Sequence, residues 1–221
     1  MTSLYDQHPL EPNPRPGVQP ALWLIYLFVQ PYRFFANMPR LVTSYTLVYA
    51  SYLYGVASAI DRLDLELARM DIGGRARPLA EFVSGSWGRY WGVALGTGLI
   101  GAIMYYAVGG WWYKTRIKWC GVADPDPHEA RRVYVFASLV WALPAVLLAV
   151  TDSLRSASPV TSEAGWLSLG LGLAALFWSY YVSYRGTRTA FGTSRWLARL
   201  WFLILPALLQ TAALVVMVLL V

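Results

Sequence analysis

Ionisable side chains are scarce in this sequence: Asp, Glu, Lys and Arg make up 14% of its 221 residues, whereas 57% are hydrophobic. A soluble domain normally carries about a quarter of its residues as charged side chains. Five runs of at least 19 residues contain no charge: Leu41–Ile60, Tyr90–Tyr113, Val133–Thr151, Gly165–Tyr184 and Leu200–Val221. About 20 residues of helix cross the hydrocarbon core of a bilayer. The sequence therefore predicts an all-α, polytopic membrane helix bundle with five transmembrane helices, and it argues against a soluble protein.

Cysteine and histidine are almost absent as well, with one and two copies. The single cysteine excludes an intramolecular disulfide. One polar cluster holds residue types that bind borderline metals: Cys120, Asp124, Asp126, His128 and Glu129. Structural metal sites repeat their ligand pairs, however, and the other histidine lies in the polar N-terminal lead. We interpret the cluster as a stiff turn with a helix cap and predict no metal site.

Catalytic motifs are missing too: no G-x-S-x-G elbow, H-E-x-x-H, P-loop or Rossmann fingerprint occurs. The serines, threonines and the cysteine have no histidine partner in a folded stretch. We therefore predict no catalytic residue, no cofactor and no enzyme activity. The net charge of +6 does not indicate nucleic acid, because no nucleic-acid-binding module is visible. In a membrane protein such an excess reports loop charges that set orientation.

The N-terminal residues lack the apolar core and cleavage site of a signal peptide. They contain five prolines, which predicts a flexible cytoplasmic lead over residues 1–20. The next apolar stretch, Ala21–Val29, is too short to cross a bilayer. Followed by aromatic residues and Arg33, it predicts an interfacial amphipathic helix over residues 21–38. A sixth span from Ala21 through Phe35 is the alternative, and residues 39–221 form the five-span bundle in either case.

Several helix boundaries can be predicted from local residues. Apolar residues at helical spacing over Leu63–Met70 continue the first span's helix, which Gly73–Gly74 would end. A short surface helix around Leu79–Val83 precedes the second span. Asp126 can cap the third helix, with Pro127 at its first position.

Small residues spaced four apart mark where helices in lipid can approach closely. Such residues occur on the first, second and fourth spans, and the candidates are Ser51, Gly55, Gly92, Gly96, Gly98, Ser168 and Gly172. Two interpretations stay open. The residues serve ordinary packing within the bundle, which is the favoured one, or they form the face of a homo-oligomer.

Because the five predicted spans contain no charged side chain, they offer no group that could couple transport to a proton or an ion. The sequence therefore argues against a proton-coupled pump or an ion exchanger. The strongest polar groups within these spans are Gln210, the serines and the tyrosines Tyr45, Tyr49 and Tyr52. A broken helix around a mid-membrane site is typical of transporters. Pro206 with Gln210 is a faint version of that pattern.

Lysine and arginine are unequally divided between the two sides of a five-span protein. Twelve lie on the side of the N-terminus and six on the other. The positive-inside rule then predicts a cytoplasmic N-terminus and an external C-terminus. Eight arginines on the inner side are candidates for contact with lipid head groups or a partner: Arg33, Arg40, Arg116, Arg131, Arg132, Arg185, Arg188 and Arg195.

Three stretches carry a family resemblance. Gln30–Leu41 has a Pro-aromatic-Arg segment before a second proline. Gly109–Leu147 has a glycine-ended span, a basic loop and a span with a central proline. Ala175–Leu209 has a Trp/Tyr-rich span, a short basic turn and the start of a last span. This layout resembles the Yip1-domain family of small five-span membrane proteins with a cytoplasmic N-terminal region. The Asp-Leu-Tyr-Gly-Pro stretch of eukaryotic members is absent, so the resemblance is to the prokaryotic branch.

We therefore expect a non-enzymatic integral membrane scaffold or adaptor of the bacterial inner membrane, possessing no cofactor. Its expected partners are membrane lipids and other membrane proteins or a second copy of itself. A permease or lipid-transport component with a cavity in the bundle is the alternative. A third reading is an accessory subunit of a larger membrane complex.

Overall fold

The computed structural model describes residues 20–71, 78–161 and 166–219, and within these ranges it contains helices and no strand. The main helices of the bundle are α3 (Ser44–Asp71), α5 (Trp87–Met104), α6 (Gly110–Trp119), α7 (Pro127–Arg155), α8 (Trp166–Phe191) and α10 (Leu205–Leu219). The remaining elements are α1 (Pro20–Val29), α2 (Pro31–Leu41), α4 (Pro78–Ser84), η2 (Pro159–Thr161) and α9 (Arg195–Arg199). The predicted all-α fold class is confirmed.

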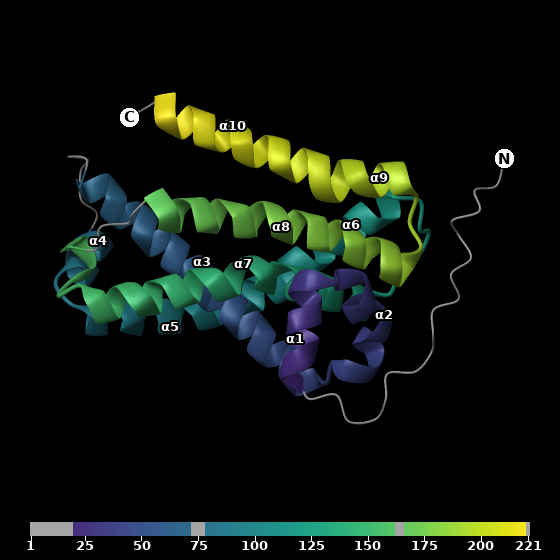
Figure 1. Cartoon of the computed structure of the whole chain (residues 1–221), viewed down its shortest axis with the longest axis horizontal. Coiled ribbons are helices and arrows are strands. Elements are labelled where there is room, and N and C mark those ends of the chain that lie inside the picture. Colours follow the sequence, from purple (N-terminus) through teal and green to yellow (C-terminus); the bar gives the residue numbers. More distant parts are fainter. Residues whose placement is uncertain (1–19, 72–77, 162–165, 220–221) are drawn as a thin grey trace.

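Two π-helical turns join some of these helices into longer ones. The turn η1 (Tyr105–Gly109) links α5 to α6, and η3 (Leu200–Ile204) links α9 to α10. The bundle thus has five long helical rods: α3, α5–α6, α7, α8 and α9–α10 (Figure 1). Each rod holds most of one uncharged run. By length and composition, three of them, Trp87–Trp119, Pro127–Arg155 and Arg195–Val216, qualify as membrane spans in the part of the chain that the structure describes.

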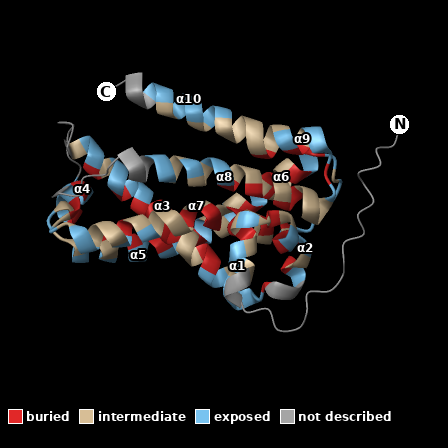
Figure 2. Cartoon of the chain, viewed as in Figure 1, coloured by how far each residue is buried: buried red, intermediate tan, exposed pale blue. Residues whose placement is uncertain are grey.

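The helix α7 lies at the centre of the bundle and α10 at its edge. α7 packs against α3, α6 and α8, whereas α10 lies alongside α8 (Figure 1). Of the most apolar window of each rod, 44% is buried in α7 and 6% in α9–α10. Buried residues accordingly concentrate where α3, α6, α7 and α8 meet (Figure 2). The outer face of α10 is left for lipid.

The tightest contact in the bundle joins α3 to α5 through two glycines. A Cβ atom added to Gly55 would overlap the carbonyl oxygen of Gly98 and lie 2.6 Å from the backbone nitrogen of Ala102. One added to Gly98 would lie 2.7 Å from Cγ2 of Val56. Only glycine lets these two backbones come so close, which is how small residues promote helix association in lipid.

The N-terminal segment is a pair of short helices rather than the single helix predicted over residues 21–38. Its chain bends between α1 and α2 at Gln30, and Pro31 occupies the first turn of α2. α1 and α2 contact each other, and α2 also packs on α8 through buried residues such as Phe35. Ten and eleven residues of helix reach only about 15–17 Å. Neither helix spans a bilayer, so a straight sixth span through Phe35 is not what the structure has. Residues 1–19 of the predicted lead lie outside the described residues.

The predicted helix boundaries agree with the structure where it describes them. α3 runs on past the first uncharged run to Asp71, while Gly73–Gly74 lie outside the described residues. The short helix α4 covers the predicted Leu79–Val83. At the start of α7, the carboxylate of Asp126 accepts hydrogen bonds from the backbone N–H groups of His128 (3.0 Å) and Glu129 (3.3 Å). Such a bond satisfies N–H groups that a helix start leaves free, and the predicted cap is confirmed.

Candidate functional site

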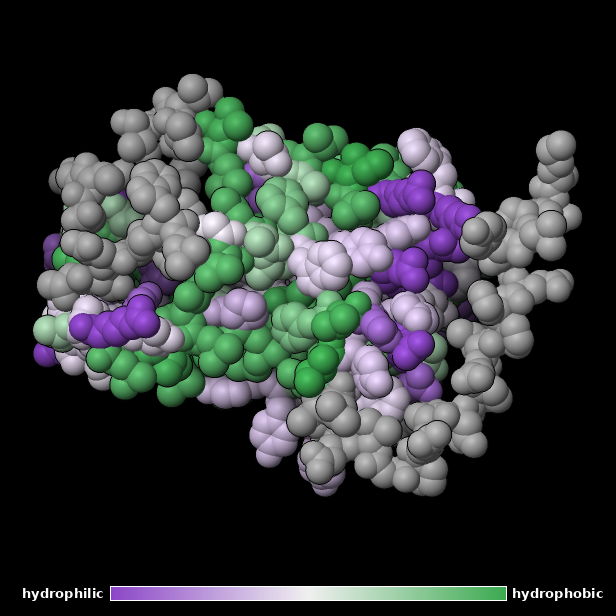
Figure 3. All heavy atoms as spheres, viewed as in Figure 1, coloured by the Kyte–Doolittle hydropathy of each residue, from purple (hydrophilic) through white to green (hydrophobic). Residues whose placement is uncertain are grey.

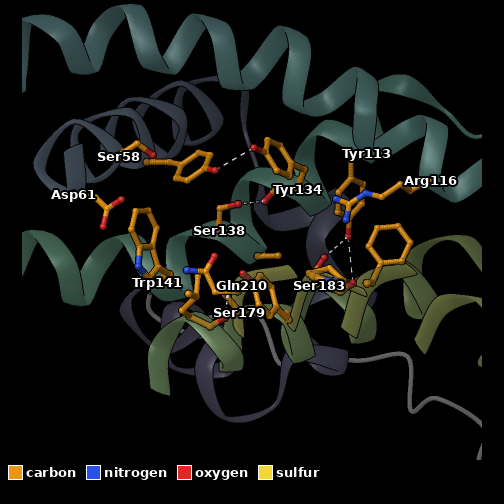
Figure 4. Close-up of a pocket in the computed structure, with 16 residues that line it drawn as sticks. Ser58, Asp61, Tyr113, Arg116, Tyr134, Ser138, Trp141, Ser179, Ser183 and Gln210 are labelled. Carbon is orange, nitrogen blue, oxygen red and sulfur yellow. Dashed lines mark hydrogen bonds between the residues drawn. The ribbon is translucent and has the colours of Figure 1, made fainter. Parts of the chain in front are cut away.

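A cavity of about 330 Å³ lies inside the bundle, walled by α3, α6, α7, α8 and the η3–α10 segment (Figure 4). Most of its lining residues carry a hydroxyl, an amide or a charge, which is unusual for the interior of a membrane bundle. Its lining residues are Tyr54, Ser58, Asp61, Tyr113, Arg116, Tyr134, Ala137, Ser138, Trp141, Leu176, Ser179, Tyr180, Ser183, Phe202, Pro206 and Gln210. A second hollow of about 540 Å³, between α7, α8 and Phe28 of α1, is lined almost wholly by apolar side chains. The polar cavity is therefore the candidate site.

Each helix presents one stripe of residues to this cavity. On α3 the stripe is Tyr54, Ser58 and Asp61, which are four and three residues apart. On α7 it runs from Tyr134 through Ser138 to Trp141, and on α8 from Leu176 to Ser183. Residues three and four apart share one face of a helix. Seven residues of helix cover about 10 Å, which sets the length of the cavity along the bundle.

At one end of the cavity a tyrosine ties α6 to α8. Tyr113 is 1% exposed, and its hydroxyl lies 2.6 Å from Oγ1 of Thr187 and 3.0 Å from Oγ of Ser183. It also donates to the backbone carbonyl of Ser183 at 3.2 Å. Buried hydroxyls need such partners because leaving one unpaired costs about 1–3 kcal/mol. The network therefore fixes this end of the site.

A second polar contact crosses the cavity between α3 and α7. The hydroxyls of Tyr54 and Tyr134 lie 3.1 Å apart. Close by on α7, the Ser138 hydroxyl donates to the backbone carbonyl of Tyr134 at 2.9 Å. On α8 the Ser179 hydroxyl donates to the carbonyl of Leu176 at 2.7 Å. These serines use their hydrogens on their own helices, so their oxygens remain available as acceptors.

The two charged residues of the wall stand at opposite ends of the cavity (Figure 4). At the α6 end, the Arg116 guanidinium lies over the rings of Tyr113 and Phe202, 5.1 and 4.7 Å from their centroids. Its Nη1 donates to the carbonyl of Trp201 at 3.3 Å. At the other end stands the carboxyl group of Asp61.

Both π-turns belong to rods that line this cavity. η1 immediately precedes the α6 turn that carries Tyr113, and η3 contains Phe202. At the second turn the cause is local: Pro206 has no N–H for the carbonyl four residues earlier. At the first, a Cβ on Gly109 would lie 2.6 Å from the hydroxyl oxygen of Tyr134. π-turns inside α-helices are frequent at functional sites.

The small residues predicted as contact points fall into different places. Gly55 and Gly98 form the α3–α5 contact described above, and Ser51 on α3 is buried. Gly92, Gly96 and Gly172 have no heavy atom within 4 Å of an added Cβ, so their faces are open within this chain. The side chain of Ser168 lies outside the described residues. Packing inside the chain therefore uses Gly55 and Gly98, and the oligomer interpretation stays a prediction for the open glycines.

The predicted head-group arginines gather at one end of the bundle. This is the end formed by α2, the C-terminal parts of α6 and α8, the start of α7, and α9; Figure 3 shows hydrophilic side chains clustered there and hydrophobic ones over the middle. Arg33 of α2 and Arg185 of α8 both lie over the ring of Tyr32, at 5.8 and 5.6 Å. The side chain of Arg40 lies outside the described residues.

The remaining arginines at this end have different surroundings. Arg131 lies over the ring of Tyr106 at 5.1 Å, and Arg132 is 3.8 Å from the carboxylate of Glu129. Arg188 is half-buried and Arg195 is exposed. Of the predicted arginines whose side chains the structure describes, Arg116 is the one that lines the cavity. Its guanidinium lies against the cavity, and contact of these arginines with head groups or a partner stays a prediction.

The cluster considered as a metal site does not converge. Cys120 is buried, Asp124 pairs with Lys114 at 3.6 Å, and Asp126 caps α7. Among the described residues no group of three His, Cys, Asp or Glu side chains could hold a metal ion. Burial raises the pKa of the Cys120 thiol to about 11, so this thiol is a poor ligand and a poor nucleophile near neutral pH.

A family model agrees with this architecture. The Yip1 domain model matches residues 25–218, from α1 to the end of α10. The chain belongs to the Yip1 domain family. The family is in general one of non-catalytic membrane proteins, and this member is an integral membrane protein. No curated protein and no solved structure matches the chain. Since the Yip1 domain match covers nearly all described helices, the cavity lies within the domain.

The sequence suggested a cavity in the bundle only as part of the permease alternative and did not identify most of its lining residues, although a signal was present. The stripes Tyr54–Ser58–Asp61 and Tyr134–Ser138–Trp141 repeat polar or amphipathic residues at helical spacing. The tyrosines singled out instead lie elsewhere: Tyr45 is 78% and Tyr49 73% exposed. Gln210, the other polar group singled out, does line the cavity.

Proposed function

We propose that this chain is a five-span integral membrane protein that acts without catalysis, by holding a small polar ligand in the cavity of its bundle. The observation that carries the proposal is the cavity wall itself. Hydroxyls, an amide and two opposite charges converge there from five helices. Buried polar groups in lipid are costly, and those retained inside a bundle are usually functional.

The number of spans is part of this proposal. α3 and α8 are 28 and 26 residues long, or about 40 Å each, which is enough to cross. They carry polar stripes on the cavity face, such as Ser58 on α3 and Ser183 on α8. These serines carry no charge, so they can lie inside a span without the cost of a buried charge. A span that lines a polar cavity need not be as apolar as one that faces lipid.

The orientation follows from the charge distribution. The arginine-rich end, with Arg33, Arg185 and Arg195, faces the cytoplasm under the positive-inside rule. The N-terminus then lies inside and the C-terminus outside, in the inner membrane of a bacterial cell. The α1–α2 pair lies at the inner interface as a part of the same domain. Reporter fusions at the two ends of the chain should score on opposite sides of the membrane.

Single-cysteine labelling tests the cavity directly. In a Cys120→Ser background, Ser179→Cys should react with a small charged thiol reagent added to membranes, because water fills a polar cavity of this size. Ile100→Cys, on the lipid-facing side of α5 and 66% exposed in the isolated chain, should not react because lipid covers it. An inert Ser179→Cys, under conditions where a denatured sample reacts fully, would rule out a water-filled site.

The second candidate is the scaffold or adaptor function that the sequence favours. The observation that supports it is the arginine-rich end beside α1, whose Ile25 and Val29 are 55% and 66% exposed. A basic surface next to exposed apolar residues suits a head-group layer or a membrane partner. Purification in mild detergent should then recover a partner or oligomer at fixed stoichiometry. A monomer free of partners would count against this candidate.

A permease would use the same cavity, not only to bind the small polar ligand but also to carry it across the membrane. The cavity lies next to Pro206 and Gln210 of α10, the least buried rod. Proteoliposomes should then show a flux that Gln210→Leu abolishes. If Ser179→Cys is labelled but the proteoliposomes show no flux, the protein binds a ligand in the cavity and does not transport the solutes tested.

A further inference from the structure

Arg116 lines the cavity as a cation that pairs with no carboxylate of the described residues. Its guanidinium lies against two aromatic rings and makes one hydrogen bond, to the carbonyl of Trp201. Its Nε is buried and has no hydrogen-bond partner. In Figure 4 the guanidinium points toward Tyr113 and the interior of the pocket rather than toward the outside.

No carboxylate of the described residues lies within ion-pair distance of this guanidinium. The described ion pairs are elsewhere and join Arg69 to Glu66, Lys114 to Asp124 and Arg132 to Glu129. Asp61, the acidic residue of the same wall, stands at the far end of the cavity (Figure 4). A desolvated cation is costly unless an anion pairs with it. The aromatic rings offset only a part of that cost.

We propose that the cavity binds an acid, a phosphate or a carboxylate, whose anionic group pairs with Arg116 while its hydroxyl or amino groups face the serines. This inference rests on the proposed ligand-binding function and names the chemistry of the ligand. A guanidinium presents a planar fork of N–H donors, and it matches the oxygens of carboxylates and phosphates.

The rest of the wall prefers a ligand that donates hydrogen bonds. Ser138 and Ser179 have given their hydrogens to backbone carbonyls, so their oxygens can only accept. The Asp61 carboxylate also accepts, and Gln210 offers both an acceptor and two donors. An acid group at the Arg116 end and hydroxyl or amino groups toward Asp61 would satisfy this wall along its length.

The size of the cavity limits the polar part of the ligand. About 330 Å³ over roughly 10 Å of helix accommodates a group of the size of a glycerol phosphate and leaves no room for acyl chains. Two sources supply this chemistry: the head group of an acidic lipid whose chains stay in the bilayer, and a free hydroxy acid or phosphate ester. The test has an arm for each.

Binding is measured on the full-length protein in detergent, by thermal stabilisation and by native mass spectrometry. The probes are phosphatidylglycerol in mixed micelles, sn-glycerol 3-phosphate and glycerate, with diacylglycerol and glycerol as controls that carry no anionic group. At least one acidic probe should stabilise the wild type, whereas the controls should not. If only phosphatidylglycerol binds, the ligand is a lipid head group. Binding of a soluble acid identifies a free solute.

The variant that tests the pairing is Arg116→Gln, and its matched control is Lys118→Gln, which removes the same charge from an exposed position two residues along α6. Loss of a charge-assisted pair should weaken binding by about tenfold or more in Arg116→Gln. The control should bind like wild type. Arg116→Lys, which keeps the charge and loses the fork, should fall between them. The empty Arg116→Gln protein should be at least as stable as wild type, because the change removes an unpaired cation.

Two results overturn the assignment. One is equal binding by Arg116→Gln and wild type, and the other is the absence of binding by every acidic probe. Either result leaves the proposed function standing if Ser179→Cys is still labelled, because the cavity would then hold water and a ligand of other chemistry. An unlabelled Ser179→Cys would instead remove the cavity and both proposals with it.

Discussion

The helix α3 borders two very different regions with neighbouring residues. On one side, Gly55 and Val56 meet α5 so closely that backbone touches backbone. On the other side, Tyr54 and Ser58 face a cavity lined by hydroxyls and charges. The first region is dry and has no space for a methyl group, whereas the second leaves a volume of about 330 Å³. The difference indicates that the bundle is held rigid on its α5 side and kept open on its α10 side.

The largest effect expected of a single change is at the dry contact. Gly55→Leu should lower the free energy of unfolding by about 3 kcal/mol, because its side chain would collide with the backbone of Gly98 and Ala102. Thermal unfolding in detergent measures this loss. Gly96→Leu, two residues before Gly98 but on an open face of α5, should change stability by less than about 0.5 kcal/mol. Equal losses in both variants would mean that α3 and α5 do not meet at Gly55.

The next largest effect is expected in the reactivity of the Cys120 thiol, which lies where the dry core meets water at the arginine-rich end of the bundle. With a pKa of about 11, the Cys120 thiol should have a thiolate fraction of about 10⁻³ at pH 8, against about a quarter for an ordinary thiol. Its reaction with a maleimide should therefore be about 100-fold slower than that of Lys118→Cys in a Cys120→Ser background. The rate should rise about tenfold per pH unit between pH 8 and 10. A fast reaction at pH 7 would show that water reaches Cys120 and that the dry region ends before α6 does.

The dry region was the easier of the two to predict from the sequence. Uncharged runs locate the rods, and small residues four apart included Gly55 and Gly98. Charge counting could not reveal where the rods end, because α3 continues through Asp61 and Asp64 to Asp71. It also could not reveal the cavity. A serine or tyrosine inside an uncharged run costs little in lipid when its hydroxyl bonds to its own helix, as Ser138 does, so polarity alone does not indicate which face is open.

The bend at Gln30 and the choice among glycines depend on tertiary contacts. Gly92 and Gly96 have the same spacing as a packing pair but face away from α3. Gly186, which no spacing rule marked, sits where an added Cβ would lie 2.8 Å from both Phe35 and Val133. Whether a position requires glycine depends on the helix that packs against it, and the spacing of residues in one sequence does not identify that helix.

A smaller effect is expected from deleting one hydroxyl at the sealed end of the cavity. Tyr113→Phe should lower the free energy of unfolding by about 2 kcal/mol, because it leaves the fully buried hydroxyl of Thr187 without its 2.6 Å partner. Tyr49→Phe, which changes a residue that is 73% exposed, serves as the control and should be neutral. Denaturant titration in detergent measures both. A neutral Tyr113→Phe would mean that water or another group satisfies Thr187.

The smallest effect is expected from deleting a tyrosine hydroxyl in the open part of the cavity. This change gives the sharpest distinction between the dry part of the bundle and the water-filled cavity. Tyr54→Phe removes the hydroxyl that lies 3.1 Å from Tyr134, yet it should cost less than about 1 kcal/mol, since water in the cavity can replace the lost partner. The chemical change is identical to Tyr113→Phe, so the difference between the two losses, measured in one titration series, reports the wetness of the two positions. If Tyr54→Phe were as costly as Tyr113→Phe, the cavity would be dry, and its polar wall would serve packing rather than a ligand.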